Sequence, residues 1–371
     1  MSREVAQKVL ERIETRDAYS HIALDVELDK SSLSTQDRAL VTELVYGTLT
    51  WRRALDNVLD NWVDGGIRRL DPEVLIALRV ATYQLLFLDR IPDHAAVDEA
   101  VKIVKRKEGG ERAGGLANAV LRKIADRRME LRWWDEDQRD SKPVQYLGDR
   151  WSLPIWIANR LIQMHGLDRT EELARAYAGR PPVHIRVRTD RLAEIDPPDA
   201  SEAIDAIPGA YHVEHLGDEV RAGLESGNWH IQDVGSQLVG WFCSPEQGAR
   251  VLDGCAGLGG KTLHLAEMVG PTGEVVALDP VNSKIAMLDD SARQASHGDT
   301  VDARVMRLED FDDDDGFDVV LVDAPCTGLG VMRRHPETRW RRTEADITRL
   351  ANQQEALLDE AVELVRPGGV L

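Results

Sequence analysis

From about residue 249 onward, the sequence repeats one order of elements: a short apolar run, a turn, and a longer amphipathic stretch. The apolar runs are ARVLD (249–253), GEVVALD (273–279), ARVMRL (303–308) and FDVVLVD (317–323), and helical patterns follow the first, second and fourth of them. Continuous apolar segments such as VVLV are typical of strands that are buried on both faces. The alternation therefore predicts an α/β domain of the Rossmann-like type, with a doubly wound, mostly parallel sheet.

The N-terminal part of the sequence has a different period. Apolar residues recur there every three or four positions, as Val5, Val9 and Ile13 do, and the DGG sequence at 64–66 marks a turn between two such segments. These features predict an all-α bundle over residues 1–140.

Between these two parts, residues 141–230 are expected to form a helical linker and a small α+β module. The sequence VHIRVR from Val183 alternates apolar and polar residues, which is the period of a half-buried strand. ASEAIDAI (200–207) then predicts a short helix, and AYHVEHL (210–216) predicts another strand. The parallel-sheet domain is expected to occupy residues 231–371.

Composition limits the class of protein further. The chain has 371 residues, of which 43% are hydrophobic, enough for two or three packed domains. Its first residues are charged throughout, unlike a signal peptide, and no apolar run is long enough to span a bilayer. We therefore expect a cytoplasmic protein without a membrane partner.

The chain has only three cysteines, at positions 243, 255 and 326. This number is too small and too scattered for a disulfide framework or a zinc cluster. We expect no metal site, and we expect any cysteine that matters to act as a thiol.

The net charge of −19 argues against a nucleic-acid partner, because phosphate binding favours a basic face. The cations are clustered, however, in RKIADRR (122–128), HIRVRTDR (184–191) and RRHPETRWRR (333–342). Each cluster is interpreted either as a solvated face or as a phosphate-binding surface.

A glycine-rich turn, GCAGLGGKT, follows the first strand of the α/β domain. Five residues separate Gly254 from Gly260, where a phosphate-binding loop has four, and Thr262 occupies the position of the third glycine of a dinucleotide fingerprint. A nucleoside ligand without a pyrophosphate remains. S-adenosylmethionine fits, with its carboxylate at the loop, its ribose at Asp279 and its adenine amino group at Asp310. The alternative is that the glycines serve packing and Asp279 caps a helix.

The fourth strand leads into DAPCTG, which brings Asp323 and Cys326 to the same strand end. Carbon 5 of cytosine becomes nucleophilic when a thiolate adds to carbon 6, and a carboxylic acid near ring nitrogen 3 facilitates that addition. A base must then remove the proton from carbon 5 before the thiol leaves. The alternative is that Cys326 is a small buried hydrophobic residue.

At this point the sequence resembles a known family, the Sun (Fmu) family of RNA cytosine-5 methyltransferases, and in particular its bacterial small-subunit ribosomal RNA members. AQKVLERI and AGGLANAVLRKI resemble the NusB-like RNA-binding domain of those enzymes, and HIQDVGSQLV resembles the entry to their catalytic domain. VLDGCAGLGGKT resembles the cofactor loop, and FDVVLVDAPCTGLGVMRRHPETRW the family signature.

The resemblance implies a role for many residues at the predicted site. Cys326 and Asp323 would be catalytic. The residues that would hold S-adenosylmethionine or frame the target base are Cys255, Ala256, Gly257, Leu258, Gly259, Gly260, Lys261, Asp279, Asp310 and Asp323. The expected phosphate contacts of the RNA are Arg333, Arg334 and Arg339. Trp340 is interpreted either as a base-stacking or as a core residue, and His335 as a structural loop residue.

The sequence departs from the family pattern in three places. Gly257 and Leu258 stand where the family usually has alanine and proline, so a more flexible loop and weaker cofactor binding are expected. Val319 stands where a basic residue is usual. In the family, the cysteine that attacks the base lies in a Thr-Cys motif beyond the Arg-Pro-Gly-Gly strand, and Cys326 would assist release. That motif is expected beyond Leu371, in a longer protein of which this chain is a truncated copy.

Three hypotheses of function follow. The first is a methyltransferase that acts on cytosine 5 of small-subunit ribosomal RNA as a monomer; within it, Cys326 could instead be the attacking thiol, as in DNA cytosine-5 methyltransferases. The second is a protein that binds RNA and cofactor without methyl transfer. The third is a methyltransferase for a small molecule or a protein.

Overall fold

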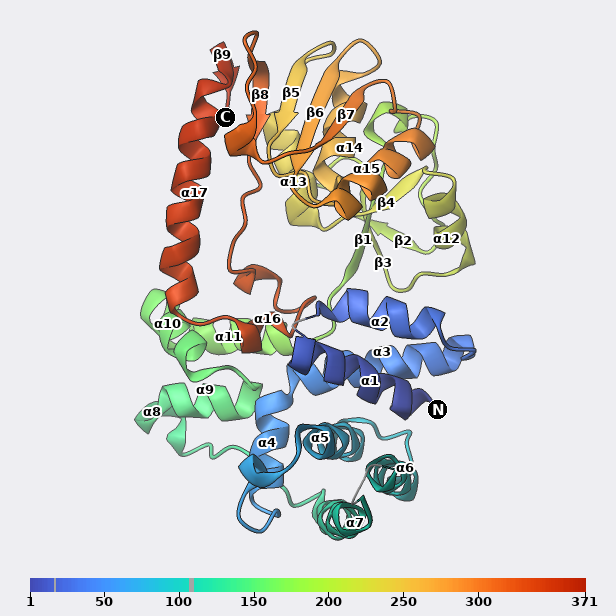
Figure 1. Cartoon of the computed structure of the whole chain (residues 1–371), viewed down its shortest axis with the longest axis vertical. Coiled ribbons are helices and arrows are strands. Elements are labelled where there is room, and N and C mark those ends of the chain that lie inside the picture. Colours follow the sequence, from blue (N-terminus) through green and yellow to red (C-terminus); the bar gives the residue numbers. More distant parts are fainter. Residues whose placement is uncertain (17, 107–109) are drawn as a thin grey trace. The chain divides into compact units, whose positions relative to one another are not determined.

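The computed structural model describes residues 1–16, 18–106 and 110–371 (Figure 1). The chain divides into two compact units, and each consists of two segments. The first unit contains residues 1–181 and 327–344, and the second contains residues 182–326 and 345–371. The segment predicted over 141–230 therefore divides: its helical linker up to residue 181 belongs to the first unit, and the α+β part from residue 182 belongs to the second.

The first unit is helical, as predicted. Its long helices are α1 (Ser2–Arg16), α2 (Ser20–Asp29), α3 (Thr35–Thr50), α4 (Arg52–Asp60), α5 (Pro72–Phe87), α6 (Asp93–Lys105), α7 (Gly110–Arg127), α9 (Pro143–Trp151), α10 (Ile155–His165) and α11 (Leu167–Ala178). Shorter helical segments are η1 (Ile67–Arg69), α8 (Gln138–Ser141), η4 (Leu329–Val331) and α16 (Thr338–Arg341). Helices α5, α6 and α7 pack side by side (Figure 1).

The apolar stripes predicted from the sequence form the cores of this unit. Val5, Val9 and Ile13 of α1 are buried in a cluster with residues of α2, α3 and α5. The DGG turn follows α4, and Gly65 and Gly66 both have a positive φ there. Among the described residues, no helix combines the length and the apolar composition needed to cross a bilayer.

The second unit begins with a four-stranded antiparallel sheet in the order β2-β3-β1-β4. Its elements are β1 (Val183–Val187), η2 (Thr189–Arg191), β2 (Ser201–Ala203), β3 (Ala210–Val213), α12 (Asp218–Glu225) and β4 (Trp229–Ile231). The strands predicted from Val183 and within 210–216 are confirmed. The helix predicted over 200–207 is wrong, because Ser201–Ala203 pairs with β3 across a turn that contains Gly209, with φ +74°.

The rest of the second unit is a five-stranded parallel sheet in the order β7-β6-β5-β8-β9 (Figure 1). Its strands are β5 (Arg250–Asp253), β6 (Glu274–Asp279), β7 (Val301–Val305), β8 (Phe317–Leu321) and β9 (Val365–Val370), and its helices are α13 (Val234–Cys243), α14 (Gly260–Val269), α15 (Asn282–Gln294), α17 (Ala345–Glu363) and the short η3 (Leu308–Asp310). The doubly wound parallel sheet is thereby confirmed.

Alternate residues of the strands enter two cores, one on each face of the sheet. Val251 and Val275 pack with α14 and α15, while Leu252 and Val276 pack with α17. Val319, where the resembled family usually has a basic residue, is 5% exposed and lies in the first of these cores. An apolar side chain suits that position because it replaces water with packed neighbours.

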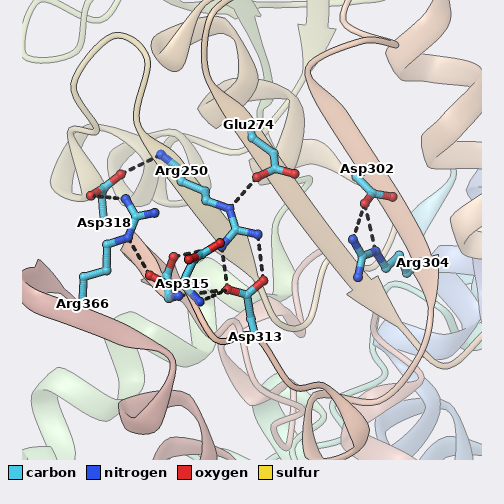
Figure 2. A network of polar contacts seen from close by, with 9 residues as sticks. Arg250, Glu274, Asp302, Arg304, Asp313, Asp315, Asp318 and Arg366 are labelled. Atoms are coloured by element: carbon cyan, nitrogen blue, oxygen red, sulfur yellow. Dashed lines mark hydrogen bonds and ion pairs between the residues drawn. The ribbon is translucent and has the colours of Figure 1, made fainter.

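The amino ends of the strands carry a network of ion pairs around Arg250 (Figure 2). Its guanidinium binds both oxygens of Asp313, at 2.6 and 2.7 Å, and donates to Glu274 Oε2 at 2.5 Å. It also lies 4.3 Å from the ring centroid of Phe317. Asp318 accepts from the backbone N–H of Arg250 and from Arg366. Asp313, one of four consecutive aspartates at 312–315, therefore joins the loop before β8 to β5.

We predict that Arg250→Met lowers the free energy of unfolding by about 2 kcal/mol, because it removes a bidentate ion pair and leaves several acceptors unpaired. Urea denaturation of both proteins measures this difference. Arg304→Met is the matched control, since Arg304 pairs with the half-exposed Asp302, two residues before it on the same strand, β7. That change is expected to cost less than about 0.5 kcal/mol, and equal losses in the two variants would contradict the prediction.

Candidate active site at the strand ends

The polar ends of three strands lie along one edge of the parallel sheet. Asp253 is the last residue of β5, Asp279 is the last residue of β6, and Asp323 follows shortly after β8. Because β5 pairs in parallel with both β6 and β8, the three carboxylates are at the same edge. In open α/β sheets this is the edge at which ligands bind.

Asp253 lies beneath the glycine loop and is 1% exposed. Its carboxylate accepts a hydrogen bond from Thr262 Oγ1 at 2.7 Å and from the backbone N–H of Cys255 at 3.4 Å. Desolvation raises the pKa of Asp253 to about 6. Asp253 therefore fixes the loop at both of its ends, through Cys255 and Thr262. It was not among the site residues predicted from the sequence.

The backbone of the glycine loop has a positive φ at two positions, which favours glycine there. Gly259 has a φ of +84°, and a Cβ placed there would lie 2.1 Å from Leu288 Cδ1. Gly257 has a φ of +60°, which would strain the alanine that is usual in the resembled family. Leu258 beside it is 53% exposed.

The loop also has space for a ligand. A Cβ on Gly257 or on Gly260 would meet no atom within 4 Å. The free backbone N–H groups at the start of α14 favour an anionic group such as the carboxylate of S-adenosylmethionine. The residues present therefore fit the expected cofactor.

Lys261 and Asp323 form an ion pair across the site. The distance from Lys261 Nζ to Asp323 Oδ2 is 2.6 Å, and 58% of the Asp323 side chain is exposed. The pair joins the first turn of α14 to the segment after β8. Cys255 in the loop is half-buried, and desolvation together with the nearby carboxylates raises its pKa to about 11, so its thiol stays protonated at neutral pH.

Asp279 is 5% exposed and both of its oxygens have partners. Oδ1 accepts from the backbone N–H of Val281 at 2.8 Å, and Oδ2 accepts from Lys284 Nζ at 3.0 Å. Each carboxylate oxygen has a further lone pair, so hydrogen bonds to ribose hydroxyls are compatible with these contacts. Asp310, the last residue of η3, is exposed after β7 at the same edge.

Cys326 is exposed at the end of the segment that follows β8. The residue before it is held in place, because Gln354 Nε2 of α17 donates to the Pro325 carbonyl at 2.9 Å. The alternative of a buried structural cysteine is therefore wrong. Asp323 and Cys326 are presented from one segment that is anchored at both ends, by Lys261 and by Gln354.

The predicted phosphate contacts after Cys326 have different environments. Arg333 is half-buried, and its Nε donates to the Gly179 carbonyl at 3.4 Å. Arg334 is half-buried as well. Arg339 is only 1% exposed, and its guanidinium donates to the backbone carbonyls of Thr50, Tyr177 and Met332. The structure therefore gives Arg339 a structural role, which corrects the expectation that it contacts RNA.

The neighbours of Arg339 are used in the same way within the helical unit. Trp340 Nε1 donates to the Leu49 carbonyl at 2.6 Å, Arg341 donates to the Ala18 carbonyl, and the Glu337 carboxylate accepts from the backbone N–H of Ser20 at 3.0 Å. These side chains bond backbone groups at the ends of α1, α2 and α3. Trp340 is thus a packing residue. A sequence motif that contains several cations does not distinguish such docking from phosphate binding.

One group of potential metal ligands occurs among the described residues, away from the glycine loop: Asp190, Glu267 and His297. Arginine side chains bind all three. Arg186 pairs with Glu267, while Arg188 pairs with Asp190 at 2.7 Å and lies 3.0 Å from His297 Nε2. This cluster is therefore an ion-pair network.

We predict that Arg339→Met lowers the free energy of unfolding by about 2–4 kcal/mol, because it leaves the buried carbonyl of Met332 and the partly buried carbonyls of Thr50 and Tyr177 without their donor. Burial lowers the pKa of Arg339 to about 10, so the native side chain is still charged at pH 7. Arg333→Met, which loses one long hydrogen bond, is expected to change stability by less than about 0.5 kcal/mol. Chemical denaturation measures both; a small loss for Arg339→Met would contradict the prediction.

A second prediction concerns pH. The pKa of Asp253 is higher in the folded protein than in the unfolded chain, where it is near 4, so the folded state binds the proton more tightly. The resulting contribution to stability is fully present below pH 4 and is lost as the pH rises through about 6. Asp253→Asn keeps the shape and removes the titration. Relative to this variant, the native protein should lose about 3 kcal/mol between pH 4 and pH 8. Denaturation across this range tests it, and a constant difference between the two proteins would refute it.

Comparisons with known proteins connect this site to a family. Residues 1–126 match the NusB family, and residues 241–371 match the family described as 16S rRNA methyltransferase RsmB/F. The chain is 35% identical over 381 residues to the Bacillus subtilis protein named "Probable ribosomal RNA small subunit methyltransferase B", covering 100% of this chain and 83% of that protein. It is 30% identical to ribosomal RNA small subunit methyltransferase B of Shigella flexneri, covering 99% and 84%.

Solved structures agree on the fold. The crystal structure of PH0851 covers 99% of this chain and 84% of its own, with a TM-score of 0.78 and 24% identity. A methyltransferase homolog from Pyrococcus horikoshii covers 62% of this chain and 75% of its own, with a TM-score of 0.51 and 22% identity. The chain belongs to the RsmB/F family of S-adenosylmethionine-dependent ribosomal RNA methyltransferases and carries a NusB domain before its catalytic domain.

Proposed function

We propose that this protein transfers a methyl group to carbon 5 of a cytosine in small-subunit ribosomal RNA through a covalent adduct between a cysteine and the base. The observation that supports this proposal best is the pairing of an exposed thiol with a carboxylate on one anchored segment. Cys326 and Asp323 follow the same strand, and Asp323 is bound to Lys261 of the glycine loop. An acid and a thiol beside a cofactor loop meet the needs of cytosine activation.

The chemistry assigns a task to each residue. Addition of a cysteine sulfur to carbon 6 breaks the 5,6 double bond and makes carbon 5 nucleophilic. Asp323 would hydrogen-bond the ring nitrogen 3 side of the base and so favour this addition. When bound, S-adenosylmethionine supplies the methyl group. After transfer, loss of the proton from carbon 5 restores the double bond and expels the sulfur.

The cofactor contacts are proposed from the same edge. Cys255 to Lys261 would surround the methionine carboxylate through backbone N–H groups, Asp279 would accept the ribose hydroxyls, and Asp310 would accept the adenine amino group. Lys284, which lies 3.0 Å from Asp279, would remain beside the ribose.

RNA contact is proposed for two of the three predicted arginines, Arg333 and Arg334. Their side chains are half-buried, and they follow Cys326 by a few residues. The target base must leave its stack to reach the thiol, as is general for enzymes that modify bases. Phosphate contacts made by these two arginines would contribute to RNA binding without reading the sequence.

We predict that RNA containing 5-fluorocytidine traps a denaturation-resistant complex with the protein in the presence of S-adenosylmethionine, because fluorine at carbon 5 cannot leave as a proton does. Gel electrophoresis under denaturing conditions detects the complex. Binding of RNA and cofactor without methyl transfer or adduct would instead support a non-catalytic protein.

The role of Cys326 is tested with ordinary RNA. If Cys326 assists release, Cys326→Ala in a protein that also carries the Thr-Cys motif of the resembled family should accumulate the covalent complex while methyl turnover falls at least about 100-fold. If no complex forms with Cys326→Ala, Cys326 is the attacking thiol and the release role is wrong. Cys243→Ala is the control, since burial raises the pKa of that thiol and it lies on α13.

A further inference from the structure

Two side chains that are hydrogen-bonded to each other contact the helix that begins at the glycine loop, each at a different residue. Helix α14 starts at Gly260 and carries Glu267 in its second half. Gln232, directly after β4, donates to the Gly260 carbonyl, and Arg186 of β1 pairs with the Glu267 carboxylate. Both side chains therefore come from the antiparallel sheet or its end, and not from the parallel sheet that carries the loop.

Arg186 is the centre of this arrangement and is 0% exposed. Its guanidinium forms a bidentate ion pair with Glu267, in which Nη2 lies 3.0 Å from Oε1, and its Nε donates to Gln232 Oε1 at 2.7 Å. A buried guanidinium with this many partners has a single favourable orientation. Arg186 thereby fixes the side-chain amide of Gln232.

Gln232 passes this constraint to the loop. It is 6% exposed, and because its Oε1 accepts from Arg186, its Nε2 group points the other way and donates to the Gly260 carbonyl at 3.1 Å. The amide orientation is thus assigned by its hydrogen bonds. The bond to Gly260 is made at the residue between the glycine turn and Lys261.

Glu267, the other residue of α14 in this set of contacts, has several partners as well. Glu267 is buried, and besides Arg186 it accepts from the backbone N–H of Thr189 at 2.7 Å and lies 3.4 Å from His230 Nε2. Desolvation opposes ionisation of Glu267, but Arg186 and, to a smaller extent, His230 hold the pKa of its carboxyl well below the usual range. A charged, fully bonded Glu267 cannot shift without losing several strong hydrogen bonds.

We propose that Gln232 and Arg186 are positioning residues for the cofactor loop. This inference rests on the proposed placement of S-adenosylmethionine at Cys255 to Lys261. The loop contains glycines at 257, 259 and 260 and so has little stiffness of its own. The hydrogen bond from Gln232 fixes the Gly260 carbonyl, and with it the direction of the neighbouring backbone N–H groups. It also sets the starting positions of Lys261 and Thr262, whose side chains reach Asp323 and Asp253.

The variant that separates the two hydrogen bonds of Gln232 is Gln232→Glu. A carboxylate still accepts from Arg186 but cannot donate to the Gly260 carbonyl, and it places two oxygens in opposition. Gln237→Leu is the matched control. Gln237 is also a buried glutamine, 0% exposed, and its Nε2 donates to the carbonyls of Ile185 and Gln232 without touching the loop.

The experiment uses the full chain and S-adenosylhomocysteine as the probe, with binding measured by isothermal titration calorimetry. We expect Gln232→Glu to raise the dissociation constant about 10-fold, the effect of losing one hydrogen bond and gaining a repulsion. Gln237→Leu should stay within about 2-fold of the native protein. Unchanged binding by Gln232→Glu, or equal weakening by Gln237→Leu, would overturn the inference.

Amide hydrogen exchange without ligand provides a second measurement. Peptides covering residues 254–263 should exchange faster in Gln232→Glu and as in the native protein in Gln237→Leu. This readout separates the two proposals. If the native protein fails to bind S-adenosylhomocysteine, the proposed cofactor site is wrong; if loop exchange does not respond to Gln232→Glu, the positioning role is wrong.

Discussion

The parallel pairing of β5 with both of its neighbours is the constraint on which the proposed active site depends. Leu252 of β5 lies in register with Val276 of β6 and Val320 of β8, so the three strands end at the same edge. The acids that end or follow these strands are therefore brought together without any specific contact between them. Asp253, the central one, is buried and bonds Thr262, and its position turns a flexible glycine sequence into a defined loop.

The distribution of arginine explains how an acidic protein of this family is built. Several of its guanidinium groups are buried and serve the fold: Arg79 pairs with Asp56 and Glu14, Arg186 pairs with Glu267, and Arg339 binds backbone carbonyls. Because these cations are desolvated and paired, they contribute nothing to a basic surface. In a protein with a net charge of −19, the number of cations available for phosphate contacts is therefore even smaller than the 46 lysines and arginines suggest.

Much of the fold could be predicted from the sequence because its signals are local. The strands of the parallel sheet, the glycine loop and the helical N-terminal part follow from periodicity and turn residues. The segment 200–207 was mispredicted as a helix because its few apolar positions fit either period, and the pairing with β3 decided the outcome. The third strand begins at Val301, two residues before the predicted start, for a similar reason: its edge position weakens the apolar pattern.

The site was predictable to the extent that its residues follow strands. Asp279, Asp323 and Cys326 were predicted in this way, and each of them ends or follows a strand of the parallel sheet. Arg339 could not be recognised as a buried residue, because its acceptors are backbone carbonyls, which leave no trace in the sequence around it. Gln232 and Arg186 were missed for the related reason that their partners lie 28 and 81 residues away.

The segment 327–344 has a consequence for how the chain is made. It belongs to the helical unit, although most of the second unit is encoded before it. During synthesis, residues 1–181 leave the ribosome first, but the carbonyls of Thr50 and Tyr177 must wait for Arg339. The helical unit therefore matures only after some 150 further residues have been added, so its final folding is delayed until most of the second unit has been synthesised.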